Sequence, residues 1–170
     1  MPLETPVMIR ADAAETLTLG DATLRLLLDA DDTGGALSAH RVRLRDGATG
    51  AEPHRHRSAT EVFHVLAGEV DLLVGQEVMR AAAGDLVVVP PLAPHAFAAA
   101  ARCDAELLVL VTPGIQRFEL FRTIARVRAG LQPAAALTGS AHRYDNHPAP
   151  TYAWETARSR RHTAPEGARP

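Results

Sequence analysis

Short apolar or alternating runs, each closed by a turn signal, dominate residues 22–112 and constrain the fold more than any other feature of the chain. These runs are ATLRLLLDA, LSAHRVRLR, EVFHVLA, EVDLLVG, EVMRAA, DLVVVP, HAFAAA and AELLVLVT. Glycine, proline and aspartate separate them at intervals of about 8–12 residues, which is the pattern of an all-β sandwich or barrel. Because no internal repeat of about 20–50 residues is present, we expect one barrel and not two in tandem.

The residues after Pro113 follow a different pattern. In IQRFELFRTIARVRAG the apolar residues recur at helical spacing, and Gly130 supplies a stop. We therefore expect a C-terminal amphipathic helix that packs on the barrel, with Arg117 and the other arginines on its solvated face. The expected parts are a lead-in (1–21), the barrel (22–112), the helix with a packing segment (113–157) and a disordered polar tail (158–170).

Charge and cysteine content limit the class of function. The 170 residues carry a formal net charge of −2, without the positive surplus that a nucleic-acid binder needs. The single Cys103 cannot form an internal disulfide. No run approaches the ~20 consecutive apolar residues of a membrane span, and the start MPLETPVMIR does not read as a signal peptide. We expect a cytoplasmic protein whose partners include neither nucleic acid nor membrane.

Three histidines and one glutamate stand out as candidate metal ligands. His54 and His56 are two residues apart, so on a strand their imidazoles face the same side, and Glu61 follows at the start of the next run. His95 comes directly after a proline-rich turn. Imidazoles with a carboxylate suit first-row transition metals such as Fe, Mn, Co, Ni, Cu or Zn. Inward-facing residues of different strands share one lumen, so a barrel can bring the four together.

Here the chain resembles a known family. The segment HRH-x4-E-x6-G, from His54 to Gly68, resembles the first motif of the cupin superfamily position by position, and G-x5-P-x4-H, ending at His95, resembles most of the second. The resemblance spans roughly residues 22–112 and extends to small single-domain bacterial cupins that include quercetin dioxygenase-like proteins. It implies a double-stranded β-helix, or jelly-roll, barrel in which the four candidate residues hold one divalent transition metal.

Two positions depart from the second motif. Leu92 stands where the family usually has glycine, and the flanking prolines can impose the turn by fixing φ. Ala99 stands where the family has asparagine, so a partner that supports the ligands is missing or is supplied elsewhere. Neither change removes a ligand.

The two phenylalanines nearest the motifs are candidates for a substrate pocket. Phe63 shares strand parity with Glu61, and Phe97 shares it with His95, so both are expected to face the lumen. Packing of the barrel core is the equal alternative, and in a small barrel one ring can serve both roles.

The remaining histidines are expected to have no role in the site. His64 lies three residues after Glu61, so strand alternation turns it to the opposite face. His40 lies in an arginine-flanked strand and is expected to be exposed. The others, His142, His147 and His162, follow the barrel and are treated as surface residues.

Three functions are compatible with such a site. The leading hypothesis is a dioxygenase acting on a small aromatic or enol substrate of polyketide type, with Glu61 accepting the substrate's hydroxyl proton. The first alternative is a non-oxidative isomerase, cyclase or dehydratase that uses the metal as a Lewis acid. The second is a small-molecule-binding cupin without turnover, a metal-dependent sensor or carrier. In each case the partner is a small molecule.

The apolar runs DLVVVP and AELLVLVT exceed what the inside of one small barrel needs. Exposed apolar patches of that size rarely stay uncovered in monomers. We therefore expect a homodimer formed by strand or sheet packing.

Overall fold

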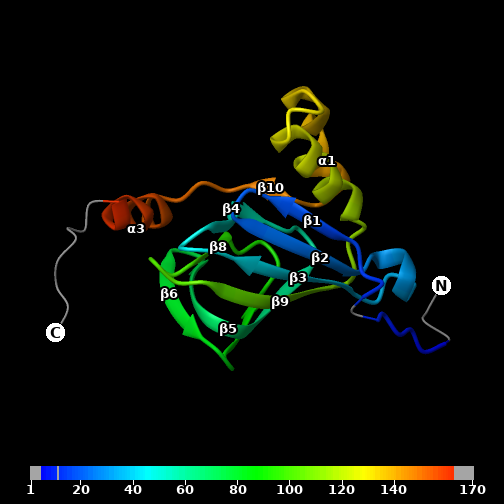
Figure 1. Ribbon diagram of the computed structural model, residues 1–170, viewed down its shortest axis with the longest axis horizontal. Helices are drawn as coiled ribbons and strands as arrows, with labels where there is room; N and C mark the ends of the chain where they lie inside the picture. The colour runs from blue at the N-terminus through cyan, green and yellow to red at the C-terminus, as the bar shows by residue number, and fades with distance from the viewer. Residues whose placement is uncertain (1–4, 11, 163–170) are drawn as a thin grey trace.

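The computed structural model describes residues 5–10 and 12–162 (Figure 1). Its elements are β1 (Thr16–Leu19), β2 (Ala22–Leu28), η1 (Ala30–Thr33), β3 (Ser38–Leu44), β4 (Thr49–Arg55), β5 (Thr60–Val74), β6 (Glu77–Ala82), β7 (Leu86–Val89), β8 (His95–Ala99), β9 (Ala105–Thr112), α1 (Phe118–Arg128), η2 (Ala134–Leu137), α2 (Ser140–Arg143), β10 (His147–Pro148) and α3 (Tyr152–His162). Antiparallel pairing gives the order β1-β2-β3-β9-β5-β8-β4-β10, with β6 and β7 also paired to β5. The strands curl around one core, which confirms the expected all-β barrel with a C-terminal helix.

Strand β5 connects the two sides of the barrel. Its first half pairs with β7 and β9, and its second half pairs with β6 and β8. The sequence shows two runs here, separated by Gly68, but the structure joins them in one strand. Gly68 has φ +71°, and a Cβ at this position would lie 2.0 Å from the carbonyl oxygen of Asp104. Only glycine therefore fits where β5 passes from one sheet to the other.

The core follows from strand alternation. Along the first half of β5, inward residues such as Phe63 and Val65 are fully buried, while Val62 and His64, which alternate with them, are only partly buried. Strand β9 repeats the pattern with Leu107 and Val109 inside. Inward residues of facing strands therefore share one apolar interior.

Helix α1 packs over the edge of the barrel beside β1 (Figure 1). Phe118 and Leu120 are buried, and Phe121 and Ile124 pack against the core from the next turns. The outward side carries ion pairs such as Arg122 with Glu15, at 2.7 Å. The amphipathic helix expected after the barrel is thus present, and it covers one end of the interior.

Helix α3 lies at the other side of the molecule, beside β6 (Figure 1). Its Trp154 is buried against Leu73, Ala96 and Ala98, on the outer faces of β5 and β8. Residues 158–162, expected to begin a disordered tail, form the last part of this helix; residues 163–170 and the side chain of His162 lie outside the described part of the chain. Among the described residues, no helix is long and apolar enough to cross a membrane.

Candidate metal centre

The structure brings the four candidate ligands together at one end of the barrel interior. His54 belongs to β4 and stands opposite His95, the first residue of β8, in the pairing of the two strands. His56 follows β4 directly, and Glu61 is the second residue of β5. One ligand atom from each residue lies within 4.8 Å of the other three. Because the strand register places them, the cluster is part of the barrel itself.

Backbone carbonyls fix the orientation of all three imidazoles. Nδ1 of His54 lies 2.8 Å from the carbonyl oxygen of Glu52, and Nδ1 of His95 lies 2.9 Å from that of Ala93. Nδ1 of His56 is within hydrogen-bond distance of the carbonyl oxygen of Asp145, in the segment after the barrel. A carbonyl only accepts, so each Nδ1 donates its proton, and in the neutral form of each imidazole Nε2 has a free lone pair.

The three lone pairs converge on Glu61. Its Oε2 lies 2.7 Å from Nε2 of His95, 3.3 Å from Nε2 of His56 and 3.9 Å from Nε2 of His54. With neutral imidazoles, three acceptor nitrogens around an acceptor oxygen repel one another unless a cation lies among them. Ligand atoms that each lie ~2.1 Å from one metal ion are themselves separated by about 3–3.5 Å. The 3.3 Å separation lies in this range, and side-chain shifts of less than about 0.5 Å would bring the other two into it, so the cluster and its donor set suit a first-row metal ion.

Burial keeps His54 in the form that binds metal. Its side chain is 12% exposed. Burial lowers the pKa of His54 to about 3, and the neighbouring His95 acts in the same direction. The imidazole is therefore neutral over the physiological range, which is the protonation state of a ligand.

The second oxygen of Glu61 is engaged by Arg117, which corrects the expectation that this arginine is solvated. Nη2 of Arg117 donates to Oε1 of Glu61 at 2.7 Å, and both side chains are buried. Burial alone raises the pKa of Glu61, but the charge of Arg117 and the contacts with His56 and His95 together outweigh it and hold that pKa well below its usual value. One carboxylate oxygen thus faces the imidazoles, and the other is held by a guanidinium.

The signal for Arg117 was present in the sequence. Leu120, Phe121 and Ile124 follow it by three, four and seven residues, so it lies on the apolar face of α1. Further along the helix, Arg122 and Arg126 lie on the outward side and pair with glutamates, whereas Arg128 donates to the Leu19 carbonyl at 3.0 Å.

A short segment after α2 closes over the histidines. We call residues 144–149 the strap. The Asp145 carbonyl accepts from Nδ1 of His56, and the Asp145 carboxylate accepts from the backbone N–H of Arg57 at 2.9 Å and of Ser58 at 3.3 Å. Further on, the strap pairs with β4, with Pro148 opposite His54. Nothing in the spacing of residues 131–157 points back to the barrel, so the amino-acid sequence alone does not place this segment at the site.

The sequence pattern of the cupin domain matches residues 40–111, which include all four candidate ligands. Residues 40–111 form a cupin domain. The finer resemblance to quercetin dioxygenase-like cupins stays a prediction, and none of the curated proteins matches the chain significantly.

Solved structures share the cupin fold with this chain. KdgF from Halomonas sp. is 20% identical, with a TM-score of 0.57 over 68% of this chain and 99% of that one. Pac13 from Streptomyces, described as a nucleoside dehydratase, is 16% identical, with a TM-score of 0.53 over 64% and 83%. The polyketide cyclase RemF from Streptomyces resistomycificus is 16% identical, with a TM-score of 0.54 over 64% and 80%.

A cavity of about 360 Å³ opens beside the cluster of candidate ligands. His54 and Glu61 form part of its wall, and Arg117 lies next to them. The other walls combine barrel residues with residues of α1, α2 and the strap, and most of them are apolar: Leu19, Leu24, Val42, Ala51, Phe97, Leu120, Phe121, Ile124, Leu137, Ala141 and Pro148. A cavity of this size accepts a small organic molecule.

The two candidate pocket phenylalanines have different positions. Phe97 lines the cavity, and a Cβ on Gly50 would lie 2.0 Å from its ring, so glycine makes room for the ring there. Phe63 is fully buried behind it, with its ring centroid 5.3 Å from that of Phe97 and 6.1 Å from that of His95. Phe63 therefore packs under the site without being part of the cavity wall.

His40 is also in the cavity wall, which corrects the expectation that it is exposed. It is 5% exposed, and its ring centroid lies 4.9 Å from that of Phe121 in α1. Burial lowers its pKa to about 3, and the charge of Arg117 adds to the effect. The residue thus presents a neutral imidazole to the cavity.

The structure accounts for the two positions that depart from the cupin motif. Leu92 adopts the left-handed conformation, with φ +69°, that glycine provides elsewhere in the family. Its N–H donates to the His56 carbonyl at 2.7 Å. Ala99, in place of the family's asparagine, is buried in β8. Support for the ligands comes instead from Arg117 and from the strap, both outside the matched domain.

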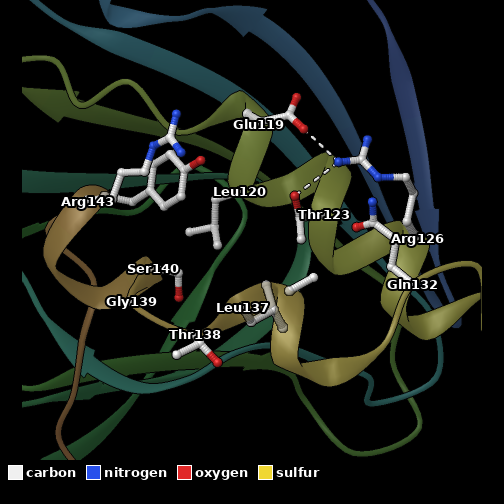
Figure 2. Close-up of a pocket in the computed structure, with 12 residues that line it drawn as sticks. Glu119, Leu120, Thr123, Arg126, Gln132, Leu137, Thr138, Gly139, Ser140 and Arg143 are labelled. Atoms are coloured by element: carbon white, nitrogen blue, oxygen red, sulfur yellow. Dashed lines mark hydrogen bonds and ion pairs between the residues drawn. The ribbon is translucent and has the colours of Figure 1, made fainter.

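A second cavity, of about 350 Å³, lies between α1 and the segment that carries η2 and α2 (Figure 2). Figure 2 shows the Arg126 side chain directed at Glu119 and Thr123, and its Nη2 donates to Glu119 at 2.6 Å and to Thr123 at 3.0 Å. Three side chains line both cavities and form the partition between them: Leu120, Leu137 and Ser140. The helical cover of the inner cavity is therefore only one layer of side chains thick at this point.

Proposed function

We propose that this protein is a metal-dependent enzyme that binds one divalent transition metal through His54, His56, Glu61 and His95 and converts a small molecule in the adjacent cavity. The observation that carries the proposal is the convergence of three imidazole lone pairs on one carboxylate oxygen at the cavity wall. A structural metal has no need of an adjoining cavity, whereas a catalytic metal needs a position that a substrate can reach.

The bound metal supplies Lewis acidity to a substrate oxygen. The protein's own contribution is to hold the ligands and exclude water. The carbonyl partners of the histidines fix the ring orientations, and the apolar side chains of α1 keep the cavity wall dry. His40 presents a neutral imidazole that can form a hydrogen bond with the substrate at the wall.

Among the possible reactions, we propose the non-oxidative class of isomerase, cyclase or dehydratase. The dioxygenase hypothesis asks Glu61 to accept a substrate proton, but the pairing with Arg117 makes this carboxylate a poor proton acceptor. Related folds described as a nucleoside dehydratase and a polyketide cyclase give independent support for the non-oxidative class.

The dioxygenase is the second candidate. Two aromatic rings, Phe97 and Phe121, line the cavity beside the ligands and favour a flat aromatic substrate. The same ligand set serves both reaction classes, so the two candidates differ in their requirement for oxygen and not in the metal site.

Turnover with and without oxygen separates the candidates. The metal-loaded protein is incubated with a panel of flavonols, catechols, 1,3-diketones and hydroxy-ketones. The products are identified by mass spectrometry, and oxygen uptake is measured in parallel. We expect isomeric or dehydrated products, formed equally well in both atmospheres. Products that contain oxygen atoms from O2 and are absent under nitrogen would establish the dioxygenase. Tight binding of compounds that return unchanged would establish a binding protein.

We further propose that the protein acts as a homodimer through the outer face of the sheet around β7. Leu86 is 62% exposed and Val88 is 55% exposed. The strand register places Val62 and Leu110 in line with Val88, and His64 and Leu108 in line with Leu86. This face, which we call the β7 face, is a contiguous apolar surface that a second copy of the chain would cover. The cytoplasmic location stays a prediction.

A further inference from the structure

The guanidinium of Arg117 has more hydrogen-bond donors than its one bond to Glu61 uses. Arg117 is 5% exposed and lines the cavity. Of its five N–H groups, one donates to Glu61, and Nε has no hydrogen-bond partner among the described residues although it is fully buried. Because the Arg117 side chain lines the cavity, the donors that Glu61 leaves unused can bind an acceptor oxygen of a ligand there.

The charges at the inner end of the cavity favour an anion. Glu61 is the acidic residue at this end, and its single charge faces both the metal position and Arg117. A divalent ion held by neutral imidazoles therefore leaves net positive charge next to a buried guanidinium. The remaining acidic residue of the cavity wall, Glu52, is exposed at the surface.

The rest of the cavity favours an apolar body. Phe97 and Val42 contribute from the barrel, and Phe121 and Ile124 contribute from α1. The Arg117 guanidinium lies 5.4 Å from the centroid of the Phe121 ring, so the charged end and the apolar wall are adjacent. A ligand that satisfies both is a small molecule with an anionic oxygen at one end and a ring or hydrocarbon at the other.

We propose that Arg117 binds the carboxylate of the substrate beside the metal, so that the substrate class is a small organic acid with an apolar body. The proposal rests on the function proposed above and names its substrate class. Planar guanidinium and carboxylate groups form paired hydrogen bonds, which lysine cannot reproduce with the same geometry. Arg117 thus combines two tasks: it holds one oxygen of Glu61 and selects the charge of the ligand.

A purely structural Arg117 would act differently. If it only neutralised Glu61, its removal would change metal retention but would not change the preference for a carboxylate over an uncharged ligand of the same shape. Benzoate and benzamide are such a pair, since both are planar and similar in size. The carboxylate preference therefore separates ligand binding from charge neutralisation.

Calorimetry with benzoate and benzamide tests the proposal on the full chain, both loaded with zinc and metal-free. We expect the zinc-loaded wild type to bind benzoate at least about tenfold more tightly than benzamide. Arg117→Met should reduce the preference to below about twofold, and Arg117→Lys should keep part of it. Arg122→Met, on the outward side of the same helix, is the control and should keep the full preference.

Two results would overturn the proposal: a wild type that binds benzoate no more tightly than benzamide, or an Arg117→Met variant that retains zinc and the full preference. If circular dichroism shows that Arg117→Met does not fold, the proposal is judged from the preference for benzoate over benzamide in the wild type and in Arg117→Lys. Zinc content is measured in every sample. Wild-type protein that binds no metal would contradict the proposed function. If metal-free wild type still prefers benzoate and metal-free Arg117→Met does not, the carboxylate-binding role of Arg117 is supported independently of the metal.

Discussion

Asp29 and Arg117 are 88 residues apart in the chain, yet the Asp29 carboxylate accepts the backbone N–H of Arg117 at 2.9 Å and that of Phe118 at 3.1 Å. Asp29 directly follows β2, on the barrel, and Arg117 is the residue that precedes α1. Arg117 makes no side-chain cap for its own helix. The barrel therefore supplies the helix cap from outside the helix, and this contact sets where the Arg117 side chain enters the cavity.

Asp29→Ala should destabilise the protein. Asp29 caps α1 and is also the capping residue of η1, so its loss leaves donors at two helix starts without partners. We expect the free energy of unfolding to fall by about 2 kcal/mol, measured by urea denaturation. Asp21→Ala, in the exposed turn between β1 and β2, should change it by less than about 0.5 kcal/mol. Equal effects of the two substitutions would contradict a capping role for Asp29.

Removal of the Asp145 carboxylate should weaken metal binding although Asp145 is not a ligand. The carboxylate anchors the strap to Arg57 and Ser58, and the same residue's carbonyl accepts from Nδ1 of His56. Asp145→Gly keeps the left-handed backbone, with φ +45° in the wild type, but loses the anchor. We expect metal affinity to drop about tenfold in a competition with a chelator.

Asp145→Asn is the matched variant, because it tolerates the same backbone conformation and keeps one acceptor oxygen. It should retain most of the affinity. Wild-type affinity in Asp145→Gly would show that the strap does not support the metal centre.

His40 should make the folded state less stable in acid. Burial holds its folded pKa at about 3, whereas the unfolded chain titrates near 6.5, so only the unfolded state gains a proton as the pH falls between these values. Arg117, which faces His40, lowers the folded pKa further, and Glu61 opposes it. Relative to His40→Gln, which cannot titrate, the wild type should lose about 1.4 kcal/mol per pH unit between about pH 6 and pH 4.

Urea unfolding of both metal-free proteins at several pH values measures this difference. A gap between wild type and His40→Gln that stays constant with pH would mean that His40 takes up its proton in the folded state as readily as in the unfolded state.

The β7 face should control oligomeric state. Val88→Arg places a charge at the centre of the proposed interface, where a second copy would have to bury it. Light scattering should give twice the chain mass for the wild type and the chain mass for the variant. Leu131→Arg, at a 75% exposed position after α1, is the control and should remain dimeric. A monomeric wild type at micromolar concentration would contradict the homodimer.

The barrel and the ligand cluster were predictable because both follow from local rules. Alternation along a strand assigns Phe63 to the inside and His64 to the outside without further information. The motif spacing likewise selects His54, His56, Glu61 and His95, and the register of β4, β5 and β8 brings them together.

The residues outside the barrel that contact the site, in the strap and at the start of α1, could not be predicted from local rules. Asp145 reaches Arg57 across 88 residues through a segment without regular periodicity, so no spacing rule connects them. Arg117 lies on the apolar face of α1, but an arginine among apolar residues is most often solvated by bending its long side chain outward. Here a buried carboxylate on β5 supplies the partner that keeps it inside.

The central claim is that His54, His56, Glu61 and His95 bind a metal ion, and elemental mass spectrometry tests it most directly. Untagged protein purified without chelators is compared with His54→Ala, which removes one imidazole from the cluster. The account predicts about one transition metal ion per chain in the wild type and a large loss in the variant. Wild-type protein that binds no metal after reconstitution, or a variant that retains the full complement, would contradict it.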